Sequence, residues 1–238
     1  MSTTGIELRK VSKVYYKDRI EIPVLDGLDL SIEPGQFVAL MGPSGSGKST
    51  LLHLIGGLDS PTGGSVRVGD AHLENMSERE RTSWRSRHIG FIFQMYHLVP
   101  VLTAAQNVEL PLLLFKMSPG ERKERVKTAL EIVGLGDRMD HRPNQLSGGQ
   151  EQRVAIARAI VTDPDAILAD EPTGDLDSKT SEEILELLNL LNTEFSKTIL
   201  MVTHDPRAAA HAARILHLEK GLLERDEINS ARFAPAAT

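Results

Sequence analysis

A nine-residue run early in the chain has the residue types and spacing needed to hold a polyphosphate. Its glycines let successive backbone N–H groups turn toward one point, and a helix that follows adds its positive N-terminal end. Lys48 adds a charge for the β- and γ-phosphates, Ser49 a hydroxyl ligand for Mg²⁺, and Thr50 a contact to the α-phosphate. The spacing G-x-x-x-x-G-K-S/T is complete in Gly42, Pro43, Ser44, Gly45, Ser46, Gly47, Lys48, Ser49 and Thr50. These residues predict a nucleoside triphosphate site.

The segments on both sides of this run predict the elements that position it. Residues 37–41 are apolar and typical of a buried strand, and the apolar residues among 51–55 share one face of a helix. The order strand, loop, helix is the one that phosphate binding requires. The alternative is a glycine-rich turn that merely opens a helix, which the complete pattern in this context disfavours.

Further motifs follow in a fixed order. Leu146 to Gln150 reads Leu-Ser-Gly-Gly-Gln before a helical run, and an apolar strand at 166–170 ends in the pair Asp170 and Glu171. Gln94 follows a strand-like run, Leu176 and Asp177 follow the carboxylates, and His204 ends another apolar run. In this order the motifs resemble those of the ATP-binding cassette (ABC) family. The resemblance extends from about Ile6 to Gly221, and each motif is present.

Phosphoryl transfer to water needs charge neutralisation and a positioned nucleophile. With Lys48, the expected catalytic residues are Glu171 as the base that orients water, His204 at the γ-phosphate and Gln94 as its sensor. The expected Mg²⁺ ligands are Ser49, Gln94 and Asp170, the last through water. The alternatives are a helix cap or charge cluster for the carboxylates, an ordinary loop amide for Gln94 and a core histidine for His204.

The resemblance implies that two copies pack head to tail around two ATP molecules. Ser147 and the amides of Gly148 and Gly149 then close over the γ-phosphate held by the loop of the other copy, by two-fold symmetry. Gln150 and Asp177 belong to the same implied nucleotide-binding set. Because the nucleotide binds the closed dimer best, ATP favours closure and hydrolysis releases it.

An aromatic residue near the start of the chain is the expected adenine contact. In ABC relatives such a residue stacks on the base, and Val11 to Tyr15 matches that stretch best. Tyr16 competes for the same role, and strand alternation does not separate the two. The further alternative is an aromatic residue of the sheet without a ligand.

Composition narrows the function further. The length of 238 residues suits one nucleotide-binding unit, and the net charge of −6 argues against nucleic acid as the main ligand. Without cysteines there are no disulfides or thiolate metal sites. No apolar stretch approaches the ~20 residues of a spanning helix, and no secretory signal is visible. We expect a cytoplasmic protein that contacts the inner membrane peripherally, through another protein.

Apolar patterning predicts two lobes. Residues 5–36 and 66–68 alternate in places, as half-exposed antiparallel strands do, whereas 37–41, 89–93, 166–170 and 198–203 are continuously apolar, as buried parallel strands are. The expected fold class is α/β, and the resemblance implies a P-loop NTPase of the ABC cassette type. Such a cassette has a mixed-sheet core lobe, an antiparallel β subdomain and an inserted α-helical lobe.

The expected domain is a single nucleotide-binding unit over residues 1–224. Its core lobe covers about 1–94 and 160–224, its helical lobe about 95–159, and residues 225–238 are expected to be a flexible tail. Within the helical lobe, Ser118 to Glu121 reads as a capping box with Pro119 at the first helical position, and Gly134 ends that helix.

Several blocks resemble ABC ATPases of the lipoprotein-release and macrolide-exporter type. They include residues 56–59, 61–64, 87–94 and 170–177, where Asp175 replaces the asparagine of many relatives. The implied partners are an integral membrane permease, docked near Met95 to Leu102, and a periplasmic adaptor. The alternative for Met95, Tyr96, Leu98 and Val99 is that they pack in the core of the hinge between the two lobes. The alternative function is a non-transport ABC complex, such as a cell-division regulator.

Overall fold

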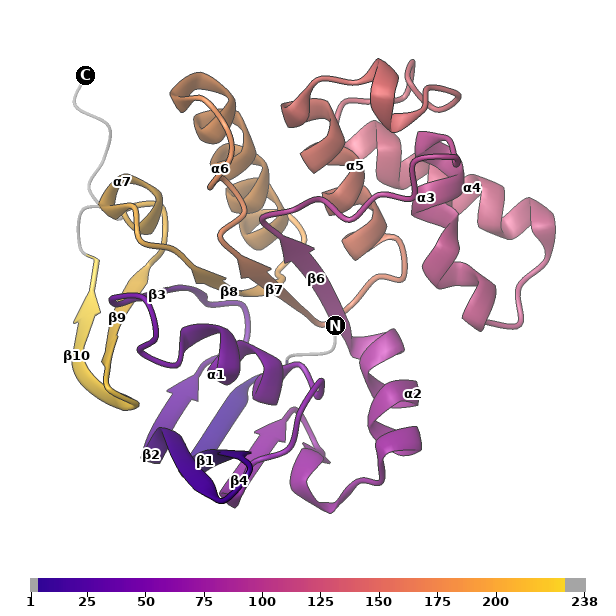
Figure 1. Ribbon diagram of the computed structural model, residues 1–238. Helices are drawn as coiled ribbons and strands as arrows, with labels where there is room; N and C mark the ends of the chain where they lie inside the picture. Colours follow the sequence, from indigo (N-terminus) through magenta and orange to yellow (C-terminus); the bar gives the residue numbers. More distant parts are fainter. Residues whose placement is uncertain (1–3, 230–238) are drawn as a thin grey trace.

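The computed structural model, described here for residues 4–229, contains two β-sheets with helices around them (Figure 1). The larger sheet has six strands in the order β10-β9-β3-β8-β7-β6. The four strands predicted to be buried and parallel are confirmed. They are β3 (Phe37–Met41), β6 (Ile89–Phe93), β7 (Ala166–Asp170) and β8 (Thr198–Val202).

These strands are continuously apolar because both faces of the larger sheet are covered. Phe37 and Ala39 of β3 pack in one cluster with the helices α5 (Gly148–Ile160), α6 (Ser178–Thr193) and α7 (Pro206–Ala209). Val38 and Leu40 point the other way, into a second cluster with α1 (Lys48–Ile55) and the smaller sheet. Because successive side chains of a strand point to opposite faces of the sheet, each strand contributes residues to both cores.

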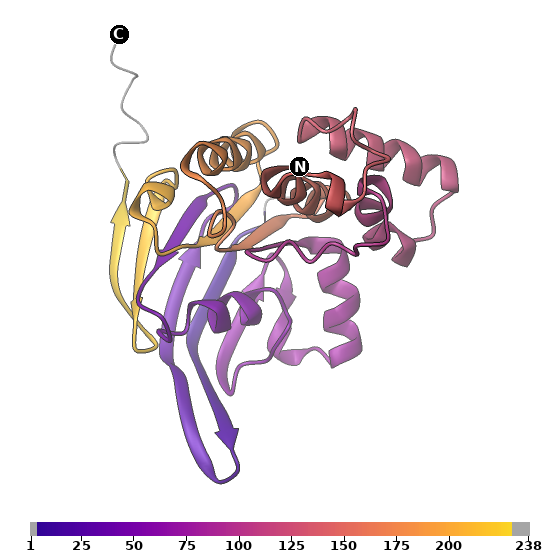
Figure 2. The same ribbon diagram turned by 45° about the horizontal axis from the view of Figure 1, so that its top comes forward.

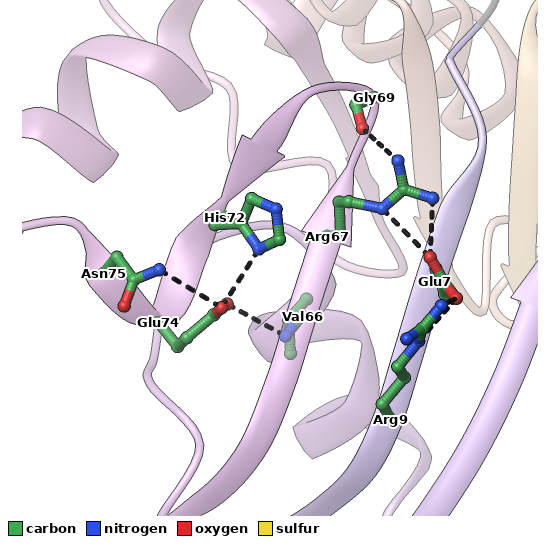
Figure 3. Close-up of polar contacts among 8 residues, drawn as sticks. All are labelled: Glu7, Arg9, Val66, Arg67, Gly69, His72, Glu74 and Asn75. Carbon is green, nitrogen blue, oxygen red and sulfur yellow. Dashed lines mark hydrogen bonds and ion pairs between the residues drawn. The ribbon is translucent and has the colours of Figure 1, made fainter.

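The smaller sheet is antiparallel, as predicted. Its order is β2-β1-β4-β5, formed by β1 (Ile6–Lys17), β2 (Ile20–Ile32), β4 (Gly63–Val68) and β5 (Ala71–His72). On its exposed face Glu7 of β1 accepts hydrogen bonds from Arg67 of β4 and from Arg9 (Figure 3). The hydrogen bond from Arg67 and, to a smaller extent, that from Arg9 lower the pKa of Glu7. The free end of the β1–β2 hairpin extends beyond the rest of the molecule (Figure 2).

Two elements connect the smaller sheet to β6. They are η1 (Leu73–Asn75) and α2 (Glu78–His88). The N-terminus of α2 has a complete capping box between Ser77 and Glu80.

A helical lobe lies between β6 and β7. It contains α3 (Ala104–Glu109), η2 (Leu110–Leu114), α4 (Pro119–Ile132), η3 (Pro143–Gln145) and α5. Ser118 caps α4 by accepting from the Glu121 N–H, with Pro119 in the first turn, as predicted. The predicted capping box is only half formed, because the Glu121 carboxylate pairs with Arg125 one turn later. Gly134 follows α4 with φ +75°.

The C-terminal part of the chain differs from the expectation. Residues 225–228, expected in the flexible tail, belong to β10 (Leu222–Ile228), which pairs antiparallel with β9 (Arg214–Glu219). Arg214 of β9 forms an ion pair with Asp226 at 2.6 Å, which helps to fix that edge strand. The rest of the expected tail, 230–238, lies outside the described residues. No helix within residues 4–229 is long and apolar enough to cross a bilayer.

Candidate active site

The loop from Gly42 to Gly47 joins β3 to α1 in a conformation that only glycine permits. Gly42 has φ +150° and Gly47 φ +104°. A Cβ atom on Gly42 would lie 2.1 Å from the Leu218 carbonyl oxygen, and one on Gly47 would lie 2.9 Å from the Val24 carbonyl oxygen. Gly47 caps α1 without a side-chain hydrogen bond, so the first N–H groups of α1 are available to a ligand.

The loop lines a cavity of ≈ 550 Å³ that also receives side chains from β2 and from the segments that follow β7 and β8. Within the loop the Lys48 ammonium donates to the carbonyls of Gly42 and Pro43, both at 2.9 Å. These two bonds use two of its three N–H groups. The lining residues are Val24, Gly42, Pro43, Ser44, Gly45, Gly47, Lys48, Ser49, Thr50, Glu171 and His204.

Ser49 and Asp170 meet at the mouth of this loop, although 121 residues separate them. The Ser49 hydroxyl lies 3.4 Å from Oδ1 of Asp170. Burial raises the pKa of Asp170, against the opposing hydrogen bond from Ser49. A hydroxyl beside a partly buried carboxylate fits Mg²⁺, which prefers oxygen ligands and would favour the ionised carboxylate.

Glu171 and His204 form a second pair at the same edge. Oε2 of Glu171 lies 3.1 Å from Nδ1 of His204. They meet because Asp170 and Val202 are register partners in the parallel strands β7 and β8. The backbone of Glu171 has φ +49°, and its N–H donates to the Val202 carbonyl at 3.0 Å. Such left-handed non-glycine residues cluster at functional sites.

Gln94 directly follows β6, and its side chain contacts the loop after β7. Its Nε2 donates to Oδ1 of Asp175 at 3.2 Å. A Cβ atom on Gly174 would approach that same Nε2 to 2.9 Å, so Gly174 makes room for the glutamine. Gln94 is not among the residues that line the phosphate cavity.

The motif residues 147–150 form the N-terminus of α5. Ser147 caps this helix, and its capping box with Gln150 is complete. A Cβ atom on Gly149 would lie 2.3 Å from Cγ2 of Thr180 in α6, and one on Gly148 would lie 3.1 Å from the hydroxyl of Tyr96. These glycines thus permit close packing, and the phosphate cavity of the same chain is not lined by residues 147–150.

Asp177 caps α6. Its carboxylate accepts from the N–H groups of Lys179 and Thr180 and, at 2.6 Å, from the Thr180 hydroxyl. The Thr180 hydrogen bonds lower the pKa of Asp177. Like the α5 motif, Asp177 lies outside the lining of the phosphate cavity.

The two tyrosines of β1 differ in their surroundings. Tyr15 is 37% exposed, and its hydroxyl donates to Oδ2 of Asp59 at 2.9 Å. Tyr16 is 64% exposed, and successive residues of a strand point to opposite faces. Neither tyrosine lines the phosphate cavity.

Two polar side chains of α5 make contacts that the sequence did not predict: Gln152 links the helical lobe to the core lobe, and Arg158 holds the segment that follows β6. Nε2 of Gln152 is buried and donates to the Pro172 carbonyl at 2.6 Å and the Phe93 carbonyl at 3.4 Å. Arg158 donates to the carbonyls of Tyr96 and His97. A polar residue among apolar ones in the helix is the only sequence signal for them, and it does not identify their partners.

The residues of the expected docking groove differ in burial. Met95 is 65% exposed and Val101 is 72% exposed. Leu98, however, is partly buried and packs against the hydrophobic cluster that the helical lobe shares with the larger sheet. The hinge-core alternative therefore holds for Leu98.

The fold and the site together define a P-loop nucleoside triphosphatase. The family described as "ABC transporter" matches residues 25–174 of the chain. The lipoprotein-releasing system ATP-binding protein LolD of Legionella pneumophila is 46% identical over 215 residues, 90% of this chain and 95% of that protein. The macrolide export ATP-binding/permease protein MacB of Rhodopseudomonas palustris is 46% identical over the whole chain, which covers 36% of MacB.

A solved structure extends the likeness to three dimensions. It is the dimeric post-hydrolysis state of the ATP-binding cassette MJ0796 bound to ADP and Pi, from a protein of Methanocaldococcus jannaschii. It has a TM-score of 0.86 and 46% sequence identity, over 94% of this chain and 98% of that one. The chain belongs to the ABC transporter family. Its fold is that family's ATP-binding cassette.

Proposed function

We propose that this protein binds ATP with Mg²⁺ and hydrolyses it to ADP and phosphate to drive a membrane permease. The observation that carries the proposal is the meeting of two pairs at one sheet edge, Ser49 with Asp170 and Glu171 with His204, beside the phosphate loop. The loop binds the phosphate groups, the Ser49–Asp170 pair supplies a metal site, and the Glu171–His204 pair supplies a base. Together they provide what phosphoryl transfer to water requires.

Each residue then has a defined task. The backbone N–H groups at the start of α1 and the Lys48 ammonium hold phosphate oxygens. Glu171 orients the attacking water and accepts its proton, while His204, in contact with that carboxylate, adds a donor toward the γ-phosphate. Ser49, Asp170 and the Gln94 amide would hold Mg²⁺. When bound, the metal neutralises charge on the phosphate oxygens.

The working unit in this proposal is a head-to-tail homodimer. In one chain Ser147, Gly148, Gly149 and Gln150 lie outside the lining of the phosphate cavity, so they act on phosphate only from a second copy. The dimeric MJ0796 structure supports this arrangement. ATP then bridges the two copies, with Asp177 near the same interface.

The partner in this proposal is a permease of the LolD/MacB type, with the cassette on the cytoplasmic face of the inner membrane. Exposed apolar residues of the helical lobe, Met95, Val101, Leu113 and Leu114, offer a surface for it. The MacB relative is named as both ATP-binding protein and permease, which supports a coupling between the two activities. A periplasmic adaptor is a further partner in the macrolide-exporter form of the proposal.

Two measurements test the proposal. The purified chain should release phosphate from ATP in the presence of Mg²⁺, and Lys48→Ala should abolish that release because a phosphate ligand is lost. Affinity capture of the chain from native membranes, followed by mass spectrometry, should yield a permease. Capture of a cell-division complex would support the non-transport alternative, and absent ATP hydrolysis would contradict the enzymatic part.

A further inference from the structure

A buried lysine and an aspartate outside the phosphate cavity form a cluster with Tyr15. Nζ of Lys13 lies 2.7 Å from Oδ1 of Asp59, and the Tyr15 hydroxyl donates to the other carboxylate oxygen at 2.9 Å. Lys13 is 9% exposed. The proposed hydrolysis chemistry makes no direct use of this ion pair.

The cluster also covers one face of the tyrosine ring. Nζ of Lys13 lies 4.7 Å from the Tyr15 ring centroid, within the range of a cation–π contact. The same ammonium donates to the Ser60 carbonyl at 2.8 Å, so its position over the ring is fixed from two sides. One face of the ring is therefore occupied by protein, and the other is the face left for a flat ligand.

Asp59 connects this ring to the helix that carries the phosphate loop. The N–H groups of Leu58 and Asp59 both donate to the His53 carbonyl in α1, at 2.9 and 3.3 Å. Asp59 is thus attached to the C-terminal end of α1, and Lys48 stands at the other end.

The ionised form of the cluster is favoured. Burial works against ionisation of Asp59, but the hydrogen bonds from Lys13, the Ser60 N–H and Tyr15 together hold its pKa below the usual value. Burial, followed by the hydrogen bond to Asp59, raises the pKa of the Tyr15 phenol. Tyr15 therefore remains a neutral donor to a charged acceptor, and such bonds are stronger than neutral ones.

We propose that Asp59 and Lys13 are positioning residues that hold the Tyr15 ring as a fixed platform for the adenine base. This inference rests on the proposed binding of ATP and on the sequence-based expectation that Tyr15 stacks on adenine. Asp59 sets the ring's position relative to the phosphate loop, and Lys13 directs the base to the opposite face. Tyr16 makes no side-chain hydrogen bond or ring contact within residues 4–229, so this positioning is specific to Tyr15.

The test compares binding of Mg·ADP with binding of Mg·pyrophosphate, which lacks the base, by titration calorimetry on the full chain. Tyr15→Phe keeps the ring and the ion pair of Asp59 but removes the phenol oxygen. We expect it to weaken ADP binding about 3- to 10-fold, the effect of one hydrogen bond. Asp59→Asn should weaken ADP binding at least as much, because it removes the ion pair with Lys13 as well as the charged acceptor for Tyr15. The effects of the two changes should be less than additive, because both alter the Tyr15–Asp59 contact. Pyrophosphate binding should not change.

The controls separate positioning from stability and from stacking. Asp226→Asn also breaks an aspartate ion pair, that with Arg214, and should bind both ligands as the wild type does. Thermal unfolding of each variant shows whether it is folded, and Tyr15→Phe remains a test if Asp59→Asn is not.

Three outcomes would overturn the inference. If Tyr15→Ala weakens ADP binding but Tyr15→Phe and Asp59→Asn do not, stacking stands and positioning is wrong. If Tyr15→Ala has no effect on ADP binding, the adenine role of Tyr15 fails as well. If folded Asp59→Asn loses pyrophosphate and ADP equally, Asp59 acts on the phosphate loop instead.

Discussion

His204 Nδ1 lies 3.1 Å from Glu171 Oε2, at the edge where β7 and β8 end side by side. The contact joins the residue expected to orient water to the residue expected at the γ-phosphate. Both side chains line the phosphate cavity. The pair therefore offers the sharpest test of the hydrolytic assignment.

Replacement of Glu171 by Gln should stop hydrolysis while ATP stays bound, since the amide keeps the size of the side chain but is no base. We expect a loss of turnover of about 10²- to 10⁴-fold, the usual contribution of a general base. Size-exclusion chromatography with ATP and Mg²⁺ should show a dimer, and the same variant with ADP serves as control. A monomer under both conditions would contradict the base assignment and the ATP-bridged dimer.

Composite sites can be tested by mixing two inactive variants. Lys48→Ala should weaken ATP binding and turnover, and Ser147→Arg should spare binding but block closure of the dimer. A heterodimer of the two has at most one intact site, so an equal mixture should reach at most about a quarter of the wild-type rate. A rate equal to that of wild type would rule out sites shared between copies.

Tyr15→Ala should raise the ATP concentration needed for half-maximal hydrolysis. Loss of one aromatic face against a base costs about 1–3 kcal/mol, or roughly 5- to 150-fold in affinity. Tyr16→Ala should have a smaller effect, because that side chain is 64% exposed and projects from the other face of the strand. The reverse order of the two effects in an ATP titration would assign the adenine contact to Tyr16.

Asp170 predicts a pH dependence of stability. Burial raises its pKa, so the folded protein takes up this proton more readily than the unfolded chain. The contribution of Asp170 to the free energy of unfolding is therefore least favourable at neutral pH and improves as the pH falls through the raised pKa. Without Mg²⁺, Asp170→Asn should unfold at a higher temperature than wild type at neutral pH, by a margin that shrinks at acidic pH.

Scanning calorimetry across that pH range measures the margin, and Asp137→Asn, at an exposed site, is the control. Mg·ADP should stabilise wild type more than Asp170→Asn, since a metal ligand is lost in the variant. An unfolding temperature of Asp170→Asn below that of wild type throughout would contradict the prediction.

The permease surface is tested by charges placed on the exposed residues. Met95→Glu and Val101→Asp should retain the ATPase rate of the isolated chain but lose co-purification with the permease and stimulation by it. Leu98→Asp should instead lower the free energy of unfolding by on the order of 2–4 kcal/mol, because Leu98 is partly buried against the hydrophobic core. Normal stimulation of both surface variants would place the docking site elsewhere.

The sequence by itself determined the local structures whose conformation depends on nearby residues. The glycine spacing of 42–47 specifies the loop, because Gly42, Gly45 and Gly47 have positive φ values that other residues rarely adopt. Runs that are apolar at every position predicted the four buried parallel strands, since only two covered faces permit such runs. Ser118 and Ser147 cap helices as residues of that type do.

Only the tertiary structure decided which distant residues meet. The polar composition of residues 225–228 suggested a flexible tail. These residues form part of β10 because they pair with β9, and that pairing is not visible in the sequence. Leu98 and Met95 have similar side chains, and only packing of the helical lobe separates core from surface. The contacts of Ser49 with Asp170 and of Tyr15 with Asp59 join residues 121 and 44 positions apart. Sheet register and helix packing create such contacts, and no local residue pattern encodes them.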